Sequence, residues 1–178
     1  MFRIALLGAA GVLASGIAAL AHVALENEQA AVGSRYKAVL QVLHGCSGSP
    51  TTAIRVRIPE GILAVKPMPK AGWKLDLVTG KYGKPHSLGN ANISEGVTEV
   101  AWSGGNLANA FYDEFVFTAD IATDLKDGET IYFPVVQQCE RGVNRWIDIP
   151  AGPAAAGGHG QGGEGAQPAP GLKLLPRR

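Results

Sequence analysis

Apolar and polar residues alternate with a period of two in several short stretches of this chain, and that pattern is typical of half-buried β-strands. The clearest stretch is 52–58, where Ile54 and Val56 alternate with Arg55 and Arg57. Similar stretches occur at 36–43, 73–78, 97–102, 112–121, 130–136 and 145–149. No stretch keeps a helical period, so the pattern predicts an all-β domain.

Turn-forming residues separate these stretches. Pro59-Glu60-Gly61, Ser103-Gly104-Gly105 and Lys126-Asp127-Gly128-Glu129 are the clearest breaks. The segment 66–72 is expected to be a turn-rich crossing, and 80–89 a turn rich in Gly and Lys. Short strands broken by Gly and Pro about every ten residues indicate a β-sandwich.

The N-terminus has the pattern of a secretory signal peptide over residues 1–21. Arg3 gives a positive start, an apolar stretch follows, and Ala19-x-Ala21 supplies small residues for cleavage. A membrane anchor is the alternative, but the stretch is near the lower length limit of a spanning helix and contains several Gly residues. Cleavage is therefore favoured, and no membrane anchor is expected after it.

Cleavage after Ala21 would make His22 the new N-terminus. An N-terminal histidine offers one metal ion two nitrogens, its free α-amine and a ring nitrogen. A tetragonal nitrogen and oxygen set suits Cu(II). The competing interpretation is a solvated terminus without a role.

The chain has two cysteines, Cys46 and Cys139. In an exported protein an even number favours a disulfide, which would stabilise the fold by about 4–5 kcal/mol in the chain-entropy model. The alternative is a soft Cu(I) site made by both thiolates and His44. The disulfide is favoured because the compartment is oxidising.

Composition changes after Pro150. We therefore expect a β-sandwich over 22–150 and an Ala/Gly/Pro-rich, disordered tail over 151–178, in which the leucines near the end either dock on the domain or stay mobile. The formal net charge is +1, with no basic stripe of the kind that binds nucleic acid. Nucleotide-binding and hydrolase motifs are absent, so a binding protein is favoured over an enzyme.

The chain resembles the YcnI family of exported copper-binding proteins, a family long described as a domain of unknown function, DUF1775. The resemblance covers the whole predicted domain. It rests on His22 after Ala-x-Ala and on segments 44–52, 55–61, 66–73, 100–105, 112–117, 132–137 and 145–150, with 168–172 similar to the family's C-terminal signature.

This resemblance implies an immunoglobulin- or fibronectin-III-like sandwich that binds Cu(II) through a mono-histidine brace. Carried over by position, the metal site consists of His22, the carboxylate of Glu114 and the ring of Trp146. Asp113 lies next to Glu114 and on the opposite strand face, so only one of the two carboxylates can face a given site. The alternative roles are a solvated strand carboxylate for Glu114 and a core side chain for Trp146.

The function predicted from these observations is Cu(II) binding in the periplasm, for copper homeostasis or trafficking. Periplasmic copper chaperones or membrane copper transporters are the expected partners. An oxidative copper enzyme is one alternative, but it would need a second histidine from within the fold, and only His44 is available. A structural or adhesive sandwich without metal is the other.

Overall fold

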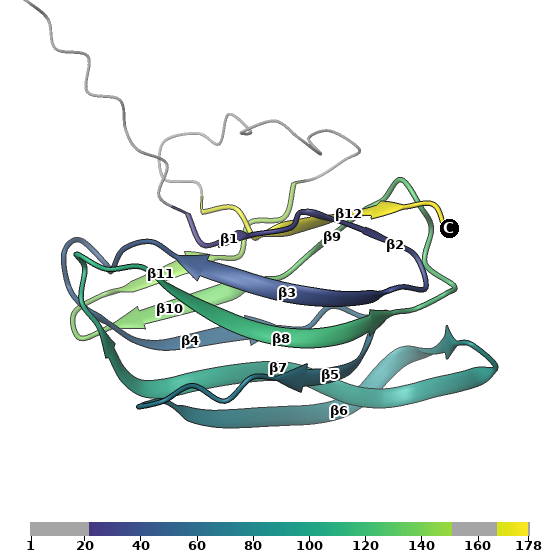
Figure 1. Cartoon of the computed structure of the whole chain (residues 1–178), viewed down its shortest axis with the longest axis horizontal. Coiled ribbons are helices and arrows are strands. Elements are labelled where there is room, and N and C mark those ends of the chain that lie inside the picture. Colours follow the sequence, from purple (N-terminus) through teal and green to yellow (C-terminus); the bar gives the residue numbers. More distant parts are fainter. Residues whose placement is uncertain (1–21, 151–166, 178) are drawn as a thin grey trace, which may run out of the picture.

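The computed structural model describes residues 22–150 and 167–177. The predicted signal peptide, residues 151–166 of the tail and Arg178 lie outside the described residues. Within the described ranges every regular element is a β-strand and no helix occurs, which confirms the all-β prediction. Figure 1 shows two sheets that face each other, with a smaller sheet along one edge.

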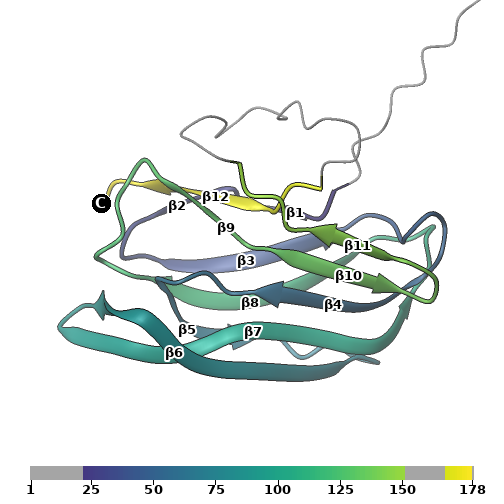
Figure 2. The ribbon, with the colours of Figure 1, turned by 180° about the vertical axis from the view of Figure 1, so that it is seen from behind.

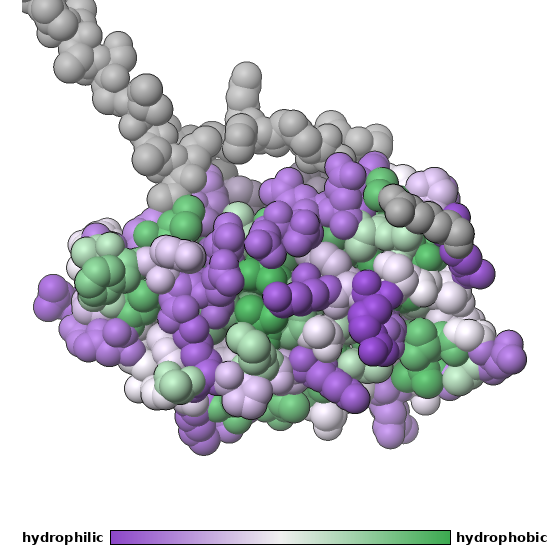
Figure 3. All heavy atoms as spheres, in the orientation of Figure 1, coloured by the Kyte–Doolittle hydropathy of each residue, from purple (hydrophilic) through white to green (hydrophobic). Residues whose placement is uncertain are grey.

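The first sheet has four antiparallel strands in the order β1–β3–β8–β5. Its strands are β1 (Ala24–Leu25), β3 (Arg35–Val42), β8 (Asp113–Ile121) and β5 (Ile62–Pro67). Figure 3 shows that hydrophilic side chains cover much of the molecular face on this side, with smaller hydrophobic patches between them.

The second sheet has five antiparallel strands in the order β11–β10–β4–β7–β6. Its strands are β11 (Val143–Trp146), β10 (Val135–Cys139), β4 (Thr51–Arg57), β7 (Ala91–Leu107) and β6 (Lys74–Leu88). Seen from behind, this sheet is in front (Figure 2). The short edge strands β1 and β11 lie on the same side of the sandwich.

The core lies between the two sheets. It is formed by the apolar residues of the strands in which apolar and polar residues alternate. Ile54 and Val56 of β4 are fully buried, whereas Arg55 and Arg57 are exposed. Aromatic rings fill the centre, and the rings of Trp102 and Phe115 lie 5.5 Å apart in an edge-on contact. Such pairs add to the stability gained by burial of the rings.

A third sheet has the order β2–β12–β9. Its strands are β2 (Gln29–Ala31), β12 (Gly171–Leu175) and β9 (Thr130–Tyr132). Leu172 and Leu174 of β12 are fully buried, so the C-terminal leucines dock on the domain. The fold therefore continues beyond residue 150, where the change in composition had placed its end.

Three segments differ from the sequence-based expectations. Strand β5 extends into the expected crossing at 66–72, because it begins with the buried residues Ile62, Leu63 and Val65 and pairs with β8 as far as Pro67. Strand β6 runs through the expected turn at 80–89, held by its long pairing with β7. The expected strand at 130–136 is two strands, β9 and β10, which belong to different sheets.

A disulfide joins Cys46 and Cys139, with an S–S distance of 2.08 Å and a Cα–Cα distance of 5.9 Å. This confirms the favoured pairing and excludes the two-thiolate Cu(I) site in this state of the protein. The bond ties the loop before β4 to the end of β10. The described residues include no helix with the length and apolar character needed to cross a membrane.

Candidate metal site

His22 and Trp146, two of the three predicted site residues, are in contact. Their ring centroids lie 5.2 Å apart with an interplanar angle of 64°, an edge-on arrangement. His22 lies two residues before β1 and is half-buried, and Trp146 ends β11 and is 6% exposed. Because β1 and β11 are edge strands of different sheets, the contact closes one open side of the sandwich.

The orientation of the Trp146 ring is set by a buried amide, that of Gln137 on β10. The side-chain oxygen of Gln137 accepts hydrogen bonds from Trp146 Nε1 at 3.2 Å and from Asn144 Nδ2 at 3.1 Å. Its Nε2 donates to the carbonyl oxygen of His44 at 2.6 Å and to Thr51 Oγ1 at 2.8 Å. Gln137 is 1% exposed, and both donors and both acceptor positions of its amide are used.

His44, in the loop after β3, also lies against Trp146. The two ring centroids are 6.5 Å apart, with an interplanar angle of 81°. From the sequence, His44 was expected mainly as a partner of the cysteine thiolates, and its position beside the indole was not predicted. The usable signal is the spacing His44-x-Cys46, because the disulfide of Cys46 holds this loop beside β10.

Glu114 and Asp113 have different environments. Asp113 Oδ1 forms an ion pair with Lys70 Nζ at 2.5 Å and accepts the backbone N–H of Glu114 at 2.8 Å. The Glu114 carboxylate accepts a long hydrogen bond of 3.4 Å from Gln41 Nε2 and forms no ion pair within the described ranges. Of the two carboxylates, Glu114 is thus the one not neutralised by a lysine.

Glu114 stands in a cross-strand row with Gln41 of β3 and Ala24 of β1. The backbones of β8 and β1 are therefore separated by two strand spacings, about 10 Å. No described contact joins Glu114 to His22, and the described residues contain no group of three or more His, Cys, Asp or Glu side chains that could hold a metal ion. The structure brings His22, His44 and Trp146 together and leaves Glu114 apart from them.

A second polar cluster surrounds the buried side chain of His86 on β6. His86 Nδ1 lies 3.1 Å from Asp124 Oδ2, and its Nε2 lies 3.5 Å from Glu60 Oε2. The backbone N–H of Gly83 donates to Glu60 Oε1 at 2.6 Å and lowers the pKa of that carboxyl group. This cluster fastens the β6–β7 hairpin to the loops after β4 and β8.

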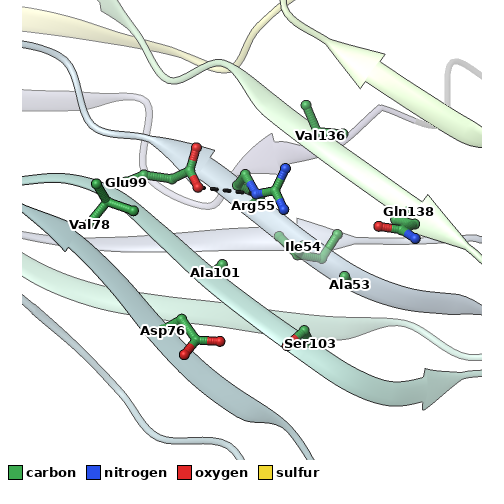
Figure 4. Close-up of a pocket in the computed structure, with 10 residues that line it drawn as sticks. All are labelled: Ala53, Ile54, Arg55, Asp76, Val78, Glu99, Ala101, Ser103, Val136 and Gln138. Carbon is green, nitrogen blue, oxygen red and sulfur yellow. Dashed lines mark ion pairs between the residues drawn. The ribbon is translucent and has the colours of Figure 1, made fainter.

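A shallow depression lies on the outer face of the five-stranded sheet (Figure 4). Small side chains of Ala53, Ala101 and Ser103 line it, and the ion pair between Arg55 and Glu99, 3.1 Å long, lies beside them. It contains none of the predicted metal ligands, so the contact of His22 with Trp146 remains the candidate site.

Comparison with a solved structure supports the fold. An uncharacterized protein from Nocardia farcinica, whose crystal structure was described as revealing an immunoglobulin-like fold, is 21% identical in sequence. The match covers 86% of this chain and 98% of that chain, with a TM-score of 0.62. At this identity the likeness shows the fold alone.

No curated protein matches the sequence. The family model described as "Domain of unknown function (DUF1775)" matches residues 22–174. That range begins at the predicted first residue of the processed chain and includes the sandwich and most of β12. The chain therefore belongs to the DUF1775 family.

Proposed function

We propose that this protein binds Cu(II) through a mono-histidine brace formed by His22 after removal of residues 1–21. The observation that carries the proposal is the edge-on contact between the imidazole of His22 and the indole of Trp146 at 5.2 Å. This contact fixes the position of His22, the residue that would offer a metal both an α-amine and a ring nitrogen.

The position of His22 suits a brace because the fold begins immediately after it. Val23 is 4% exposed and packs in the core, and Ala24 pairs with Gln41. A new α-amine at His22 would therefore be held one residue from a buried side chain. This anchoring reduces the entropy lost when amine and ring bind one ion.

The proposed oxygen donor is Glu114. Asp113 is paired with Lys70, whereas the hydrogen bond of the Glu114 carboxylate among the described residues is the long one from Gln41, which it can exchange for a metal. A carboxylate would also offset part of the positive charge of Cu(II). Because the backbones of β8 and β1 lie about 10 Å apart, its side chain must move toward His22 to reach the ion.

The indole of Trp146 is proposed to cover one side of the copper ion. Its ring is 6% exposed and fixed by Gln137, so it would limit the approach of water and external reductants to that side. The same side chain packs in the core between the sheets. The core role and the site role are compatible because only part of the ring is needed to contact His22.

The proposed location is the periplasm, and the proposed role is copper homeostasis or trafficking, in exchange with periplasmic copper chaperones or membrane copper transporters. The disulfide between Cys46 and Cys139 fits an oxidising compartment. We propose binding without catalysis, and the absence of ascorbate-driven oxygen consumption by the copper-loaded protein is the result expected from it.

The deciding experiment is a Cu(II) titration of the processed chain beginning at His22, followed by electron paramagnetic resonance. A matched chain whose His22 α-amine is acetylated keeps every side chain and loses only the free amine of the histidine. We expect one stoichiometric site in the first protein and its loss in the second. Equal binding by both proteins would refute the brace.

A further inference from the structure

We propose that the outer face of the five-stranded sheet is a docking surface for a second copy of this chain, in a symmetric and reversible dimer. The proposal does not rest on the copper site, because that site lies at the edge strands β1 and β11 and not on this face. Two observations carry it. The centre of the face is lined by small side chains, and its two halves differ in charge.

The small side chains are those of Ala53 on β4 and of Ala101 and Ser103 on β7, which line the shallow depression in Figure 4. Their neighbours Ile54 and Trp102 are fully buried, so the alternation of side chains along each strand turns the small ones outward. Small outward side chains leave room for the side chains of a second sheet, and sheets that face each other pack about 10 Å apart. The centre of this face can therefore accept a flat partner.

The charges of the face are divided between its two halves. One cross-strand row runs from β11 to β6 through Arg145, Val136, Arg55, Ala101 and Asp76. In the next row, Arg57 of β4 stands opposite Glu99 of β7. The arginines thus lie on β11 and β4, whereas β7 and β6 carry both acidic side chains and one lysine, Lys74. Glu99 forms an ion pair with Arg55, whereas the side chains of Arg57 and Arg145 form none among the described residues.

A two-fold axis that runs parallel to the strands and between β4 and β7 would place each half of the face against the opposite half of the second copy. Such a contact is isologous, so each pairing occurs twice. Arg57 would face the partner's Glu99, which can keep its own Arg55 because a carboxylate has two accepting oxygens. Arg55 would lie over the partner's Ala101, whose small side chain leaves space for it. Complementary charges of this kind fix the register of an interface and speed its formation.

The free edge of this sheet at β6 is a less suitable contact for a second copy. Strand β6 carries Lys74, Lys81 and Lys84, and lysines on an edge strand oppose pairing with another edge. The face itself has five strands, and with strands about 4.8 Å apart it is roughly 20 Å wide. A patch of this width is at the small end of protein interfaces, so we expect the dimer to be weak and reversible.

The test is sedimentation velocity of the processed chain from micromolar to near-millimolar concentration, at low and at high salt. We expect a concentration-dependent dimer that weakens as salt screens the charges. Arg57→Glu should weaken dimerisation at least about 10-fold, because it creates two like-charge contacts with Glu99 at once. The double variant Arg57→Glu, Glu99→Arg should restore the dimer, and it keeps opposite charges at this cross-strand position within each chain.

Lys37→Glu is the matched control. Lys37 is exposed on β3, in the other sheet, and its substitution changes the net charge by the same amount as Arg57→Glu. This variant should dimerise as the unsubstituted protein does. Circular dichroism of each variant separates loss of the dimer from loss of the fold.

A monomer at every concentration would overturn the proposal, and binding of poly-glutamate to that monomer through Arg57 would assign the face to an acidic partner instead. A dimer that is equally strong in Arg57→Glu, or that is weakened as much by Lys37→Glu, would also overturn it, because the contact would then lie elsewhere. Failure of the double variant to restore the dimer would overturn the pairing of Arg57 with Glu99 across the two-fold axis.

Discussion

The indole N–H of Trp146 donates a hydrogen bond to the side-chain oxygen of Gln137 at 3.2 Å, inside the sandwich. The orientation of the aromatic ring against His22 thus depends on a buried amide on the neighbouring strand. That amide also binds the backbone of His44. A change at Gln137 should therefore affect both stability and metal binding.

We predict that Gln137→Leu lowers the free energy of unfolding by about 2–4 kcal/mol, because several buried polar partners lose their hydrogen bonds. Chemical denaturation followed by tryptophan fluorescence measures this. Gln138→Leu is the matched control, since Gln138 is the adjacent, exposed residue, and it should change stability by less than about 0.5 kcal/mol. Equal effects of the two substitutions would contradict the role of Gln137.

Copper binding should quench the fluorescence of Trp146 selectively. Its ring contacts His22, and a paramagnetic ion on that imidazole would lie within quenching range. Trp146→Phe keeps an aromatic ring but should remove most of the Cu(II)-dependent quenching, which a fluorescence titration records. Trp73→Phe is the comparison, because Trp73 packs instead on Phe115, at a centroid distance of 4.9 Å. Quenching that persists in Trp146→Phe would place the copper elsewhere.

Substitutions of the adjacent carboxylates Glu114 and Asp113 should have different effects on copper binding and on stability. Glu114→Gln is expected to weaken Cu(II) binding with little loss of stability, because the bond of the Glu114 side chain within the described ranges is a long one of 3.4 Å. Asp113→Asn should leave copper affinity unchanged but destabilise the fold modestly, since it removes the partner of Lys70. Calorimetric titration and thermal unfolding distinguish them. The reverse pattern would assign the metal oxygen to Asp113.

Loss of the disulfide should destabilise the protein strongly. The bond joins residues separated by 93 positions, and removal of a constraint on a loop of this length costs about 4–5 kcal/mol in the chain-entropy model. The double variant Cys46→Ser, Cys139→Ser should therefore unfold at a clearly lower denaturant concentration. A midpoint within error of the unsubstituted protein would show that packing alone fixes this end of the sandwich.

Acid should weaken the attachment of the β6–β7 hairpin. The hydrogen bond from Gly83 lowers the pKa of Glu60. For Asp124, burial raises the pKa, but the backbone hydrogen bond of Ser87 and nearby positive charge outweigh it, so the pKa of Asp124 is also lowered. Carboxyl groups with a lowered pKa in the folded state stabilise it above their unfolded pKa of about 4, and this stability is lost as the pH falls through the folded value.

We therefore expect the free energy of unfolding to fall below about pH 4, and Glu60→Gln to reduce its slope against pH. Denaturant titrations at a series of pH values would measure both quantities. Asp76→Asn is the comparison, since Asp76 is a half-exposed carboxylate on β6 paired with Lys74. A slope unchanged in Glu60→Gln would show that the hairpin is held by other contacts.

Much of the fold could be predicted because its cause is local. Strands β4 and β8 alternate core and surface residues in the sequence itself, and that alternation is the physical reason for their pleated, half-buried state. Strand β5 was missed because its apolar run is short and ends at Pro67, in a stretch that resembles a turn, and its pairing with β8 makes it a strand. Strand β12 is likewise formed by its partners β2 and β9.

The sandwich, the cysteine pair and the family could be predicted from the amino-acid sequence, because strand periodicity, cysteine number and ordered motifs are readable without distances. It also identified His22 and Trp146 as candidates. The contacts of His22 and of His44 with Trp146 follow from the three-dimensional fold, since more than 100 positions separate Trp146 from either histidine and sheet pairing and the disulfide set the distances between the rings.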